Sequence, residues 1–261
     1  MIEIVAMIVI MIIIFLLLFW LKKTLFLFGF FFKLAMLFML IVVVGSFVFG
    51  YLVVKDANDF KNNFSNSTSM MIVKQTTNGT ESFLAGVTLN PEKKEYNSMS
   101  QKQLSNVEQL YKDNKISTLG ADYYKVFIIE LKSFDEVKLY NISDQNVELS
   151  GAEIKTIMLS DNARADLSSI IAKKSGRKAN DVYNELAATD EGVKSYLLSY
   201  YLSTVFNPSN ITQFLTQLKK DNIQVYANTP LFQAIKLVPQ TLINTMAPKS
   251  ITNTSISNVT S

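Results

Sequence analysis

Apolar and polar residues divide this chain into two regions. From Met1 to Val54 the sequence is almost continuously apolar. The charged residues in that stretch are Glu3, Lys22, Lys23 and Lys33. From Lys55 onward charges are frequent, and apolar residues come in short, patterned runs. We therefore expect an apolar N-terminal region followed by one soluble domain that is long enough to bury a hydrophobic core of its own.

Two apolar runs in the N-terminal region have lengths typical of membrane-spanning helices. Ile4–Trp20 is unbroken, and Trp20 stands where an interfacial aromatic residue is common. Leu34–Val54 is free of charge and close to the ~20 residues that cross ~30 Å of hydrocarbon. The small residues of this second run, which would let another helix approach closely, are Gly45, Ser46 and Gly50. The sequence therefore predicts a two-segment transmembrane helical hairpin over residues 1–54.

The lysines set the predicted orientation of this hairpin. Lys22, Lys23 and Lys33 fall in the connection between the two runs. The N-terminal flank carries only Glu3. Under the positive-inside rule the connection lies in the cytoplasm, so the N-terminus and the soluble domain lie outside. A single crossing by the second run also leaves the domain outside. We expect a multi-pass protein of the cell membrane with an extracytoplasmic C-terminal domain.

A cleaved signal peptide is the alternative interpretation of the first run. A signal peptide needs a basic segment before its apolar stretch and small residues after it. Here Glu3 precedes the run, and Trp-Leu-Lys-Lys ends it. The pattern therefore favours a retained membrane segment.

Acceptor triplets for N-glycosylation agree with an external domain. All of them lie beyond residue 55, and they begin at Asn63, Asn66, Asn78, Asn141, Asn210, Asn253 and Asn258. Chance also produces such triplets in a segment this rich in Asn, Ser and Thr. The triplets are therefore candidate glycosylation sites and support the predicted orientation only weakly.

Strands are expected mainly in the first half of the soluble domain. Residues 55–69 read as a polar juxtamembrane stalk. Met70–Gln75 and Ser82–Leu89 have strand character, and the turn pair Asn78-Gly79 between them predicts a hairpin. Further strand candidates are Tyr123–Leu131, Val137–Ile142 and Ala152–Leu159. The segment Ser98–Asp113 between these strands has apolar residues at helical spacing and predicts a helix.

Helices are expected to predominate after Ser160. Apolar residues recur at helical spacing up to Val205, and Pro208 suits the first turn of another helix. Ile223–Tyr226 is a predicted last strand, and a helix from about Pro230 to Met246 must accommodate a proline at 239. This segregation predicts a membrane-anchored α+β protein with one soluble domain at 70–246. Residues 247–261 are rich in Ser, Thr and Asn, and we expect a disordered tail there.

Composition excludes several classes of chemistry. The chain contains no histidine and no cysteine. Histidine-dependent triads, histidine general bases, cysteine nucleophiles, thiolate zinc sites and disulfide bonds are therefore impossible within it. Neither the phosphate-binding loop motif nor the dinucleotide-binding glycine motif occurs, so no cofactor is predicted. The net charge of +3 comes mostly from the three N-terminal lysines, so no surface for nucleic acid is predicted.

One short motif could carry catalysis. Ser175-Gly176-Arg177-Lys178 has the S-x-x-K spacing that places a lysine base one helical turn from a serine nucleophile. However, Gly176 lies inside the turn that must be helical, and no Ser-Asp-Asn or Lys-Thr-Gly companion follows. A solvated turn between two helices explains the same residues, so Ser175 and Lys178 are weak catalytic candidates.

Three other clusters of residues each have a structural explanation as well as a functional one. Basic residues at Lys173–Lys178 could meet anionic headgroups, although cations also suit a solvated helix end. Asp56–Asp59 could supply oxygen ligands to calcium, although this spacing lacks the features of an EF-hand loop. Tyrosines between Tyr183 and Tyr201 could form an interface, although an amphipathic helix facing its own core has the same spacing.

These observations favour a non-enzymatic, membrane-anchored extracytoplasmic binding or assembly protein, or an accessory subunit of a membrane complex. We expect the membrane and another protein as its partners, with contact through other membrane helices. A Ser/Lys-type hydrolase of envelope polymers is the alternative that Ser175 and Lys178 would support. A solute-binding or sensory module is a further alternative, but the short connection between the two runs leaves no room for a cytoplasmic output domain.

Overall fold

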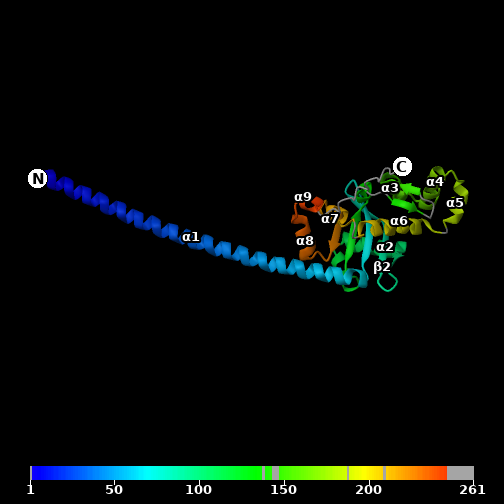
Figure 1. The fold of residues 1–261 in the computed structure, drawn as a ribbon, viewed down its shortest axis with the longest axis horizontal. Coiled ribbons are helices and arrows are strands. Elements are labelled where there is room, and N and C mark those ends of the chain that lie inside the picture. The colour runs from blue at the N-terminus through cyan, green and yellow to red at the C-terminus, as the bar shows by residue number, and fades with distance from the viewer. Residues whose placement is uncertain (1, 137–138, 143–146, 187, 208–209, 246–261) are drawn as a thin grey trace, which may run out of the picture. The chain divides into compact units, whose positions relative to one another are not determined.

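A computed structural model describes residues 2–136, 139–142, 147–186, 188–207 and 210–245 of the chain. It divides into two compact units, residues Met1–Val54 and Lys55–Ser261. The first unit consists of the greater part of helix α1 (Ile2–Asn63), which ends in the second unit. The second unit is a mixed α+β domain built on one central sheet (Figure 1).

Helix α1 is a single long apolar helix, so a second membrane segment is not shown. The predicted hairpin requires a turn between the two apolar runs, but α1 continues without interruption through Lys22, Lys23 and Lys33. The connection contains no proline, and its leucines and lysines are good helix formers. Within the described residues, one helix, Phe31–Asn66, is long and apolar enough to cross a membrane. Its side chains from Phe31 to Tyr51 are exposed in the protein chain.

The last part of α1 belongs to the α+β domain. After α1 a short 3-10 helix, η1 (Phe64–Asn66), leads into the first strand. Residues 55–69, for which the sequence predicts a polar stalk, thus form the end of a helix and a turn. Phe60 and Phe64 from this segment pack against the hydrophobic core of the domain.

The central sheet begins with the predicted hairpin. Strands β1 (Met70–Thr77) and β2 (Thr80–Asn90) pair antiparallel. Asn78 and Gly79 connect them with φ angles of 50° and 78°. Positive φ at both central residues is the requirement of a type I′ turn, and Asn-Gly meets it with little strain. The prediction of a hairpin at this position is confirmed.

The sheet has five strands in the order β3-β2-β1-β4-β7. Strand β4 (Val126–Glu130) lies parallel to β1, and β7 (Ile223–Tyr226) lies antiparallel to β4. Strand β3 (Glu95–Ser98), which sequence patterning did not predict, forms the opposite edge. A separate two-stranded sheet pairs β5 (Leu139–Ile142) with β6 (Val147–Leu149).

Both faces of the central sheet are covered, which explains the nearly continuous apolar runs of β1 and β4. On one face, Met70 and Ile72 contribute to a cluster with α2 (Gln101–Lys112) and η2 (Ile116–Ala121). On the other face, Met71 and Val73 contribute to the larger core with the later helices. The side chains of successive strand residues thus serve two different cores.

The larger core is covered by helices that follow the strands in sequence. They are preceded by the 3-10 helix η3 (Leu131–Glu136). In chain order these helices are α3 (Gly151–Leu159), α4 (Ala163–Ser175), α5 (Ala179–Glu185), α6 (Asp190–Val205), α7 (Ile211–Lys219), α8 (Pro230–Leu237) and α9 (Gln240–Thr245). All strands except β7 lie before residue 150, and most helices of the domain lie after it, which confirms the predicted α+β class. Pro239 separates α8 from α9, as its lack of an N–H group requires.

Helix α3 corrects the strand predicted at Ala152–Leu159. Ser150 accepts a hydrogen bond from the backbone N–H of Glu153, and the Glu153 carboxylate accepts one from the N–H of Ser150. This capping box satisfies donors that a helix start leaves without partners. The local capping therefore outweighs the alternation of Ile154 and Thr156, which suggested a strand.

Candidate functional site

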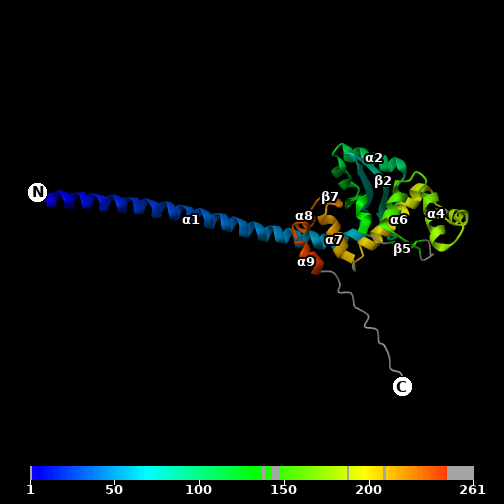
Figure 2. The same ribbon diagram turned by 90° about the horizontal axis from the view of Figure 1, so that it is seen from above.

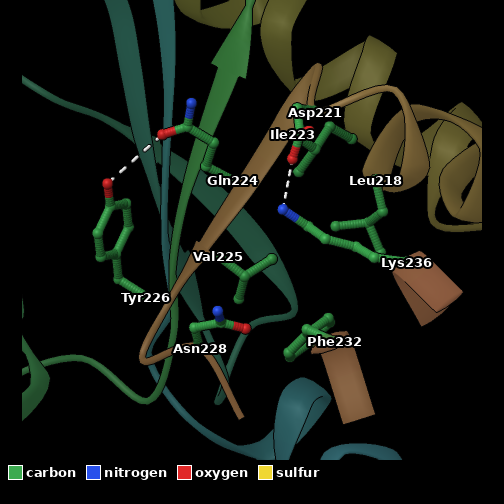
Figure 3. Close-up of a pocket in the computed structure, with 9 residues that line it drawn as sticks. All are labelled: Leu218, Asp221, Ile223, Gln224, Val225, Tyr226, Asn228, Phe232 and Lys236. Atoms are coloured by element: carbon green, nitrogen blue, oxygen red, sulfur yellow. Dashed lines mark hydrogen bonds and ion pairs between the residues drawn. The ribbon is translucent and has the colours of Figure 1, made fainter. Parts of the chain in front are cut away.

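A groove runs beside strand β7, at one edge of the central sheet (Figure 3). Its volume is about 280 Å³. The lining residues come from the end of α7, from β7 and the residues after it, and from α8, and they are Leu218, Asp221, Ile223, Gln224, Val225, Tyr226, Asn228, Phe232 and Lys236. Strand β7 thus forms one wall of an open depression at the sheet edge.

The register of β7 determines which of its backbone groups face this open edge. The N–H of Glu130 donates to the carbonyl of Asn222 at 2.8 Å, and the same ladder pairs Ile128 with Gln224. Alternate residues of an antiparallel strand direct their backbone groups to opposite sides. Ile223 and Val225 therefore direct their N–H and C=O groups away from β4. Within the part of the chain that the structure describes, no strand pairs with that side of β7.

The side chains of the groove are apolar at its base and charged at one end. Leu218, Val225 and Phe232 are buried. Asp221 and Lys236 form an exposed ion pair beside them, as Figure 3 shows. The lining residues include no serine, threonine, cysteine or histidine. The groove lining therefore provides no serine, threonine or cysteine nucleophile.

A buried lysine forms a second polar cluster on the sheet face that packs against α2. The Lys74 ammonium contacts the carboxylates of Glu81 and Glu130, the latter at 3.0 Å, and donates to the Tyr111 hydroxyl at 2.9 Å. Burial by itself lowers the pKa of Lys74, but its hydrogen bonds to these partners raise the pKa above its ordinary value. Lys74 is therefore charged in the fold. Tyr111 and Glu81 also line a neighbouring pocket of about 260 Å³.

A polar joint fixes the end of α1 to the rest of the domain. Asp56 accepts a hydrogen bond at 2.9 Å from the backbone N–H of Leu231, in the first turn of α8. The Tyr124 hydroxyl donates to the Asp59 carboxylate at 2.6 Å. Burial raises the pKa of Tyr124 most, and the hydrogen bond to Asp59 raises it further. The Asp56 carboxylate thus caps the N-terminal end of α8, where a negative charge is favourable.

Lys125 lies in the same joint and is almost fully buried. Its ammonium is 5.0 Å from the ring centre of Tyr124 and 5.7 Å from that of Phe232. Burial lowers its pKa, and the negative charges of Asp56 and Asp59 oppose that shift. The two acidic residues that the sequence offered as calcium ligands thus bind a backbone amide and a tyrosine and lie near a lysine. No group of three metal-ligating residues occurs among the described residues.

Aromatic rings complete the joint. The Phe60 ring stacks on Phe64 at 4.9 Å between centroids and meets Phe232 edge-on at 5.4 Å. The ring centroid of Phe64 lies 5.7 Å from that of Phe127 in β4 and 5.1 Å from that of Phe206, which follows α6. The helix end therefore contacts the central sheet, α8 and the C-terminus of α6. Figures 1 and 2 show α8 beside this end of α1.

The structure does not bring Ser175 and Lys178 into a catalytic arrangement. Ser175 is the last residue of α4, and its hydroxyl donates to the carbonyl of Ile171 at 2.7 Å. Gly176 then adopts a left-handed conformation with φ of 73°, which ends the helix. Lys178 therefore lies outside the helical turn that the S-x-x-K geometry requires. Both residues are exposed.

The basic cluster and the tyrosines have structural partners in the fold. Lys174 pairs with Glu153 at 2.7 Å, and Arg177 pairs with Glu185. Tyr201 is fully buried and stacks on Phe134 at 4.2 Å between ring centroids. Lys174, Arg177 and Tyr201 thus have structural partners, whereas Tyr183 and Tyr196 are exposed.

The residues predicted for topology and helix contact all lie in α1. Trp20, Lys22 and Lys23 are helical, and Lys33 is helical and exposed. A side chain added at Gly45 or Gly50 would meet nothing within 4 Å. The Ser46 hydroxyl donates to the carbonyl of Val42 at 2.7 Å. Gly45, Ser46 and Gly50 thus lie on an open helix surface, and their role in helix contact stays a prediction.

The candidate glycosylation sites occupy different local structures. Asn63 donates to Asp59 at 2.7 Å, Asn66 to the carbonyl of Asn62 at 2.7 Å, and Asn210 to that of Thr204 at 3.1 Å. Asn78 is exposed in the hairpin turn, and Asn141 lies in β5. Asn253, Asn258 and the rest of the predicted tail lie outside the described residues. Use of these sites stays a prediction.

Comparisons with protein-family models, curated proteins and solved structures give no match for this chain. Sequence reasoning missed three parts of the geometry, namely Lys74, Lys125 and the two phenylalanines of the joint. Strand alternation places Lys74 on the same face as Ile72, so a core lysine could have been recognised. No local signal identifies the free edge of β7, because strand order depends on the whole fold.

Proposed function

We propose that the protein is a non-enzymatic, membrane-anchored extracytoplasmic binding or assembly protein that acts as an accessory subunit of a membrane complex. The observation that carries this proposal is the joint at the end of α1. Asp56, Phe60 and Phe64 attach that helix end to the domain without an intervening linker. Because residues 55–64 pack into the domain, the chain passes directly from the domain into the apolar run, which suits a subunit that works next to the membrane.

Membrane insertion is supported by the composition and exposure of α1. The stretch Leu34–Val54 has the length of a bilayer crossing and is flanked by Lys33 and Lys55. Its large side chains are exposed to the surroundings, with Phe47 77% exposed. Apolar side chains in water are unfavourable by about 25 cal/mol per Å². Hydrocarbon would remove that cost, and the basic residues before the crossing favour an external domain.

A second crossing by Ile4–Trp20 stays an alternative within this proposal. It requires a break of α1 between Lys22 and Lys33, because a straight helix cannot return to the same bilayer. With a single crossing, the N-terminus and these lysines share the cytoplasmic side. With two crossings, the N-terminus lies outside with the domain. In both arrangements the domain is extracytoplasmic.

The partner we propose is another membrane protein that packs on the second apolar run. Ser46 and Gly50 are four residues apart, the spacing of a small-residue helix contact. Their side of α1 is open in the chain. Within the membrane, close packing at such residues is a principal source of helix association. The domain would then be held beside the external part of the same complex.

Affinity purification of the full chain in mild detergent tests this function. We expect a stoichiometric membrane partner to co-purify with the wild-type chain. The Gly50→Ile variant should lose that partner, because added methyl groups prevent close approach of a second helix. The Val48→Ile variant, which adds a methyl group on the opposite face of the helix, is the matched control and should retain it. Recovery of the wild-type chain as a lone monomer would contradict the proposal, as would equal partner recovery by both variants.

A further inference from the structure

The two most exposed large apolar side chains in the described part of the α+β domain lie on one turn, where α8 ends and α9 begins. Leu237 is 76% exposed and Leu242 is 52% exposed. Pro239 stands between them and is exposed as well. We call residues 237–242 the elbow. Isolated apolar residues are common on protein surfaces, whereas neighbouring ones on a single turn mark a candidate contact surface.

The fold holds the elbow in place but leaves its leucines outside the core. Ile235 packs against the larger core. Leu237 follows it by two residues, about 200° around the helix axis, and therefore points away from that core. On the other side of the turn, Ile243 is buried. The Lys219 ammonium donates to the carbonyl of Val238 and ties the turn to α7. Packing within the domain thus gives no reason for a leucine at 237 or 242.

The elbow belongs to the side of the domain where α1 joins it. Asp56, two residues after the apolar run ends at Val54, accepts a hydrogen bond from the N–H of Leu231 in the first turn of α8. Helix α8 has 8 residues and is therefore about 12 Å long. Figures 1 and 2 show α8 and α9 on this side of the domain. The elbow therefore lies about one short helix away from the point where the chain enters its apolar run.

A bilayer surface is the partner that the elbow fits. Lys219 and Lys236 border the leucines, and Lys236 also pairs with Asp221 at the domain surface. A lysine stem lies along apolar surface while its ammonium stays at the level of the headgroups. Leucines flanked by lysines are typical of segments that lie in a membrane interface. The elbow therefore matches lipid headgroups and the outer part of their acyl chains.

Attachment through α1 makes a contact of this size sufficient. Two leucines provide little apolar area, and even a whole myristoyl chain gives a soluble protein only reversible membrane binding. In a chain whose helix already crosses the bilayer, however, the elbow meets lipid at a high effective concentration. A contact that is too weak to recruit a free domain can then be occupied in an anchored one.

We propose that the elbow inserts Leu237 and Leu242 into the interface of the bilayer that α1 crosses. This inference rests on the proposed function, because it requires α1 to span that bilayer. With α1 as the first attachment and the elbow as the second, the domain is held at two points on one membrane. Rotation of the domain about α1 is then restricted, which presents a constant face to a partner in the same membrane.

The full chain, reconstituted in vesicles of phosphatidylcholine and phosphatidylglycerol with brominated acyl chains, tests the proposal. The chain has no cysteine, so each single-cysteine variant carries one nitrobenzoxadiazole label. Relative to vesicles without bromine, we expect about twofold quenching at Leu237→Cys, because a group ~5–10 Å into the interface lies within reach of the bromines. Leu159→Cys, at the exposed end of α3, is the matched control and should not be quenched. Phe47→Cys reports on the membrane crossing itself.

The three labels separate failure of this proposal from failure of the anchoring. Quenching at Phe47→Cys with equally weak quenching at Leu237→Cys and Leu159→Cys would overturn the elbow contact and leave the anchoring intact. Absence of quenching at Phe47→Cys would refute the anchoring, and the elbow contact with it. An apolar emission spectrum at Leu237→Cys without quenching would show burial against protein, such as a second copy, and would contradict insertion into lipid.

A second measurement tests the leucines with the label elsewhere in the elbow. Thr241→Cys places it on an exposed position of α9. Adding Leu237→Ser and Leu242→Ser should reduce its quenching at least about twofold, because the apolar area that favours insertion is removed. Adding Leu159→Ser instead is the matched control and should leave the quenching unchanged. Equal quenching with and without the two elbow leucines would overturn their role.

Discussion

Removing the Phe64 side chain should loosen the joint between α1 and the α+β domain. The ring lies within 6 Å, between centroids, of Phe60, Phe127 and Phe206. Truncation of a buried phenylalanine to alanine costs ~3–5 kcal/mol, and each aromatic pair contributes about 0.5–1.5 kcal/mol beyond area burial. Because Phe64 is only partly buried, we expect about 3 kcal/mol for Phe64→Ala. That is a large fraction of the ~5–15 kcal/mol that stabilises a typical domain.

Urea unfolding in detergent, followed by the near-ultraviolet circular dichroism of the domain's tyrosines, measures this loss. Phe47→Ala is the matched control on the same helix, because Phe47 is exposed and belongs to the apolar run outside the domain. We expect Phe64→Ala to lower the free energy of unfolding by about 3 kcal/mol and Phe47→Ala to leave it within about 0.5 kcal/mol of wild type. Equal values for the two variants would refute a packed joint.

Three further predictions concern the polar groups of the domain. Lys74→Met should lower the free energy of unfolding in urea by about 3 kcal/mol, because it leaves two partly buried carboxylates without their cation. Adding Glu130→Gln should restore part of this loss, and no loss in the single variant would contradict the ion cluster. Burial raises the pKa of Tyr96 to about 12, so its stabilising contribution is complete below pH 10 and is lost as the pH rises toward 12. Tyr96→Phe should therefore move the midpoint of alkaline unfolding to higher pH, and an unchanged midpoint would count against burial of this hydroxyl. Burial by itself raises the pKa of Glu153, but hydrogen bonds from Lys174 and Ser150 lower it below its ordinary value; its contribution is present above about pH 4.5 and lost as the pH falls through the lowered pKa. Glu153→Gln should flatten acid unfolding, whereas an unchanged acid profile would contradict this role.

Local signals in the sequence were sufficient for several elements of the fold. Asn78-Gly79 specifies its turn through positive φ angles, and Pro239 ends α8 by its missing donor. The strand Val126–Glu130 is indicated by its β-branched and aromatic residues, which are buried on both faces of the sheet. In each case the physical cause lies within a few residues of the element. Such elements can be predicted without knowledge of the tertiary structure.

Other features depend on contacts between distant segments. Glu95–Ser98 is a strand because β2 offers it a paired edge, although its own residues are polar and largely exposed. Phe60 and Phe64 stand in a sequence of polar residues that resembles a stalk, and only the fold brings Phe127 and Phe232 to them. The candidate groove likewise depends on strand order. The predicted break between the two apolar runs is not seen in α1, because lysines that mark a membrane boundary do not by themselves break a helix.

The membrane-anchored external domain is tested most directly by labelling single cysteines on intact cells. The chain contains no cysteine, so each variant carries one thiol. Ser105→Cys places it on an exposed position of α2, Thr24→Cys places it beside the lysines, and Glu3→Cys reports the N-terminus. With a membrane-impermeant maleimide, we predict labelling of Ser105→Cys on intact cells and of Thr24→Cys only after permeabilisation. Labelling of Glu3→Cys on intact cells would indicate two crossings, and its protection would indicate one. Labelling of Ser105→Cys only after permeabilisation would contradict an extracytoplasmic domain.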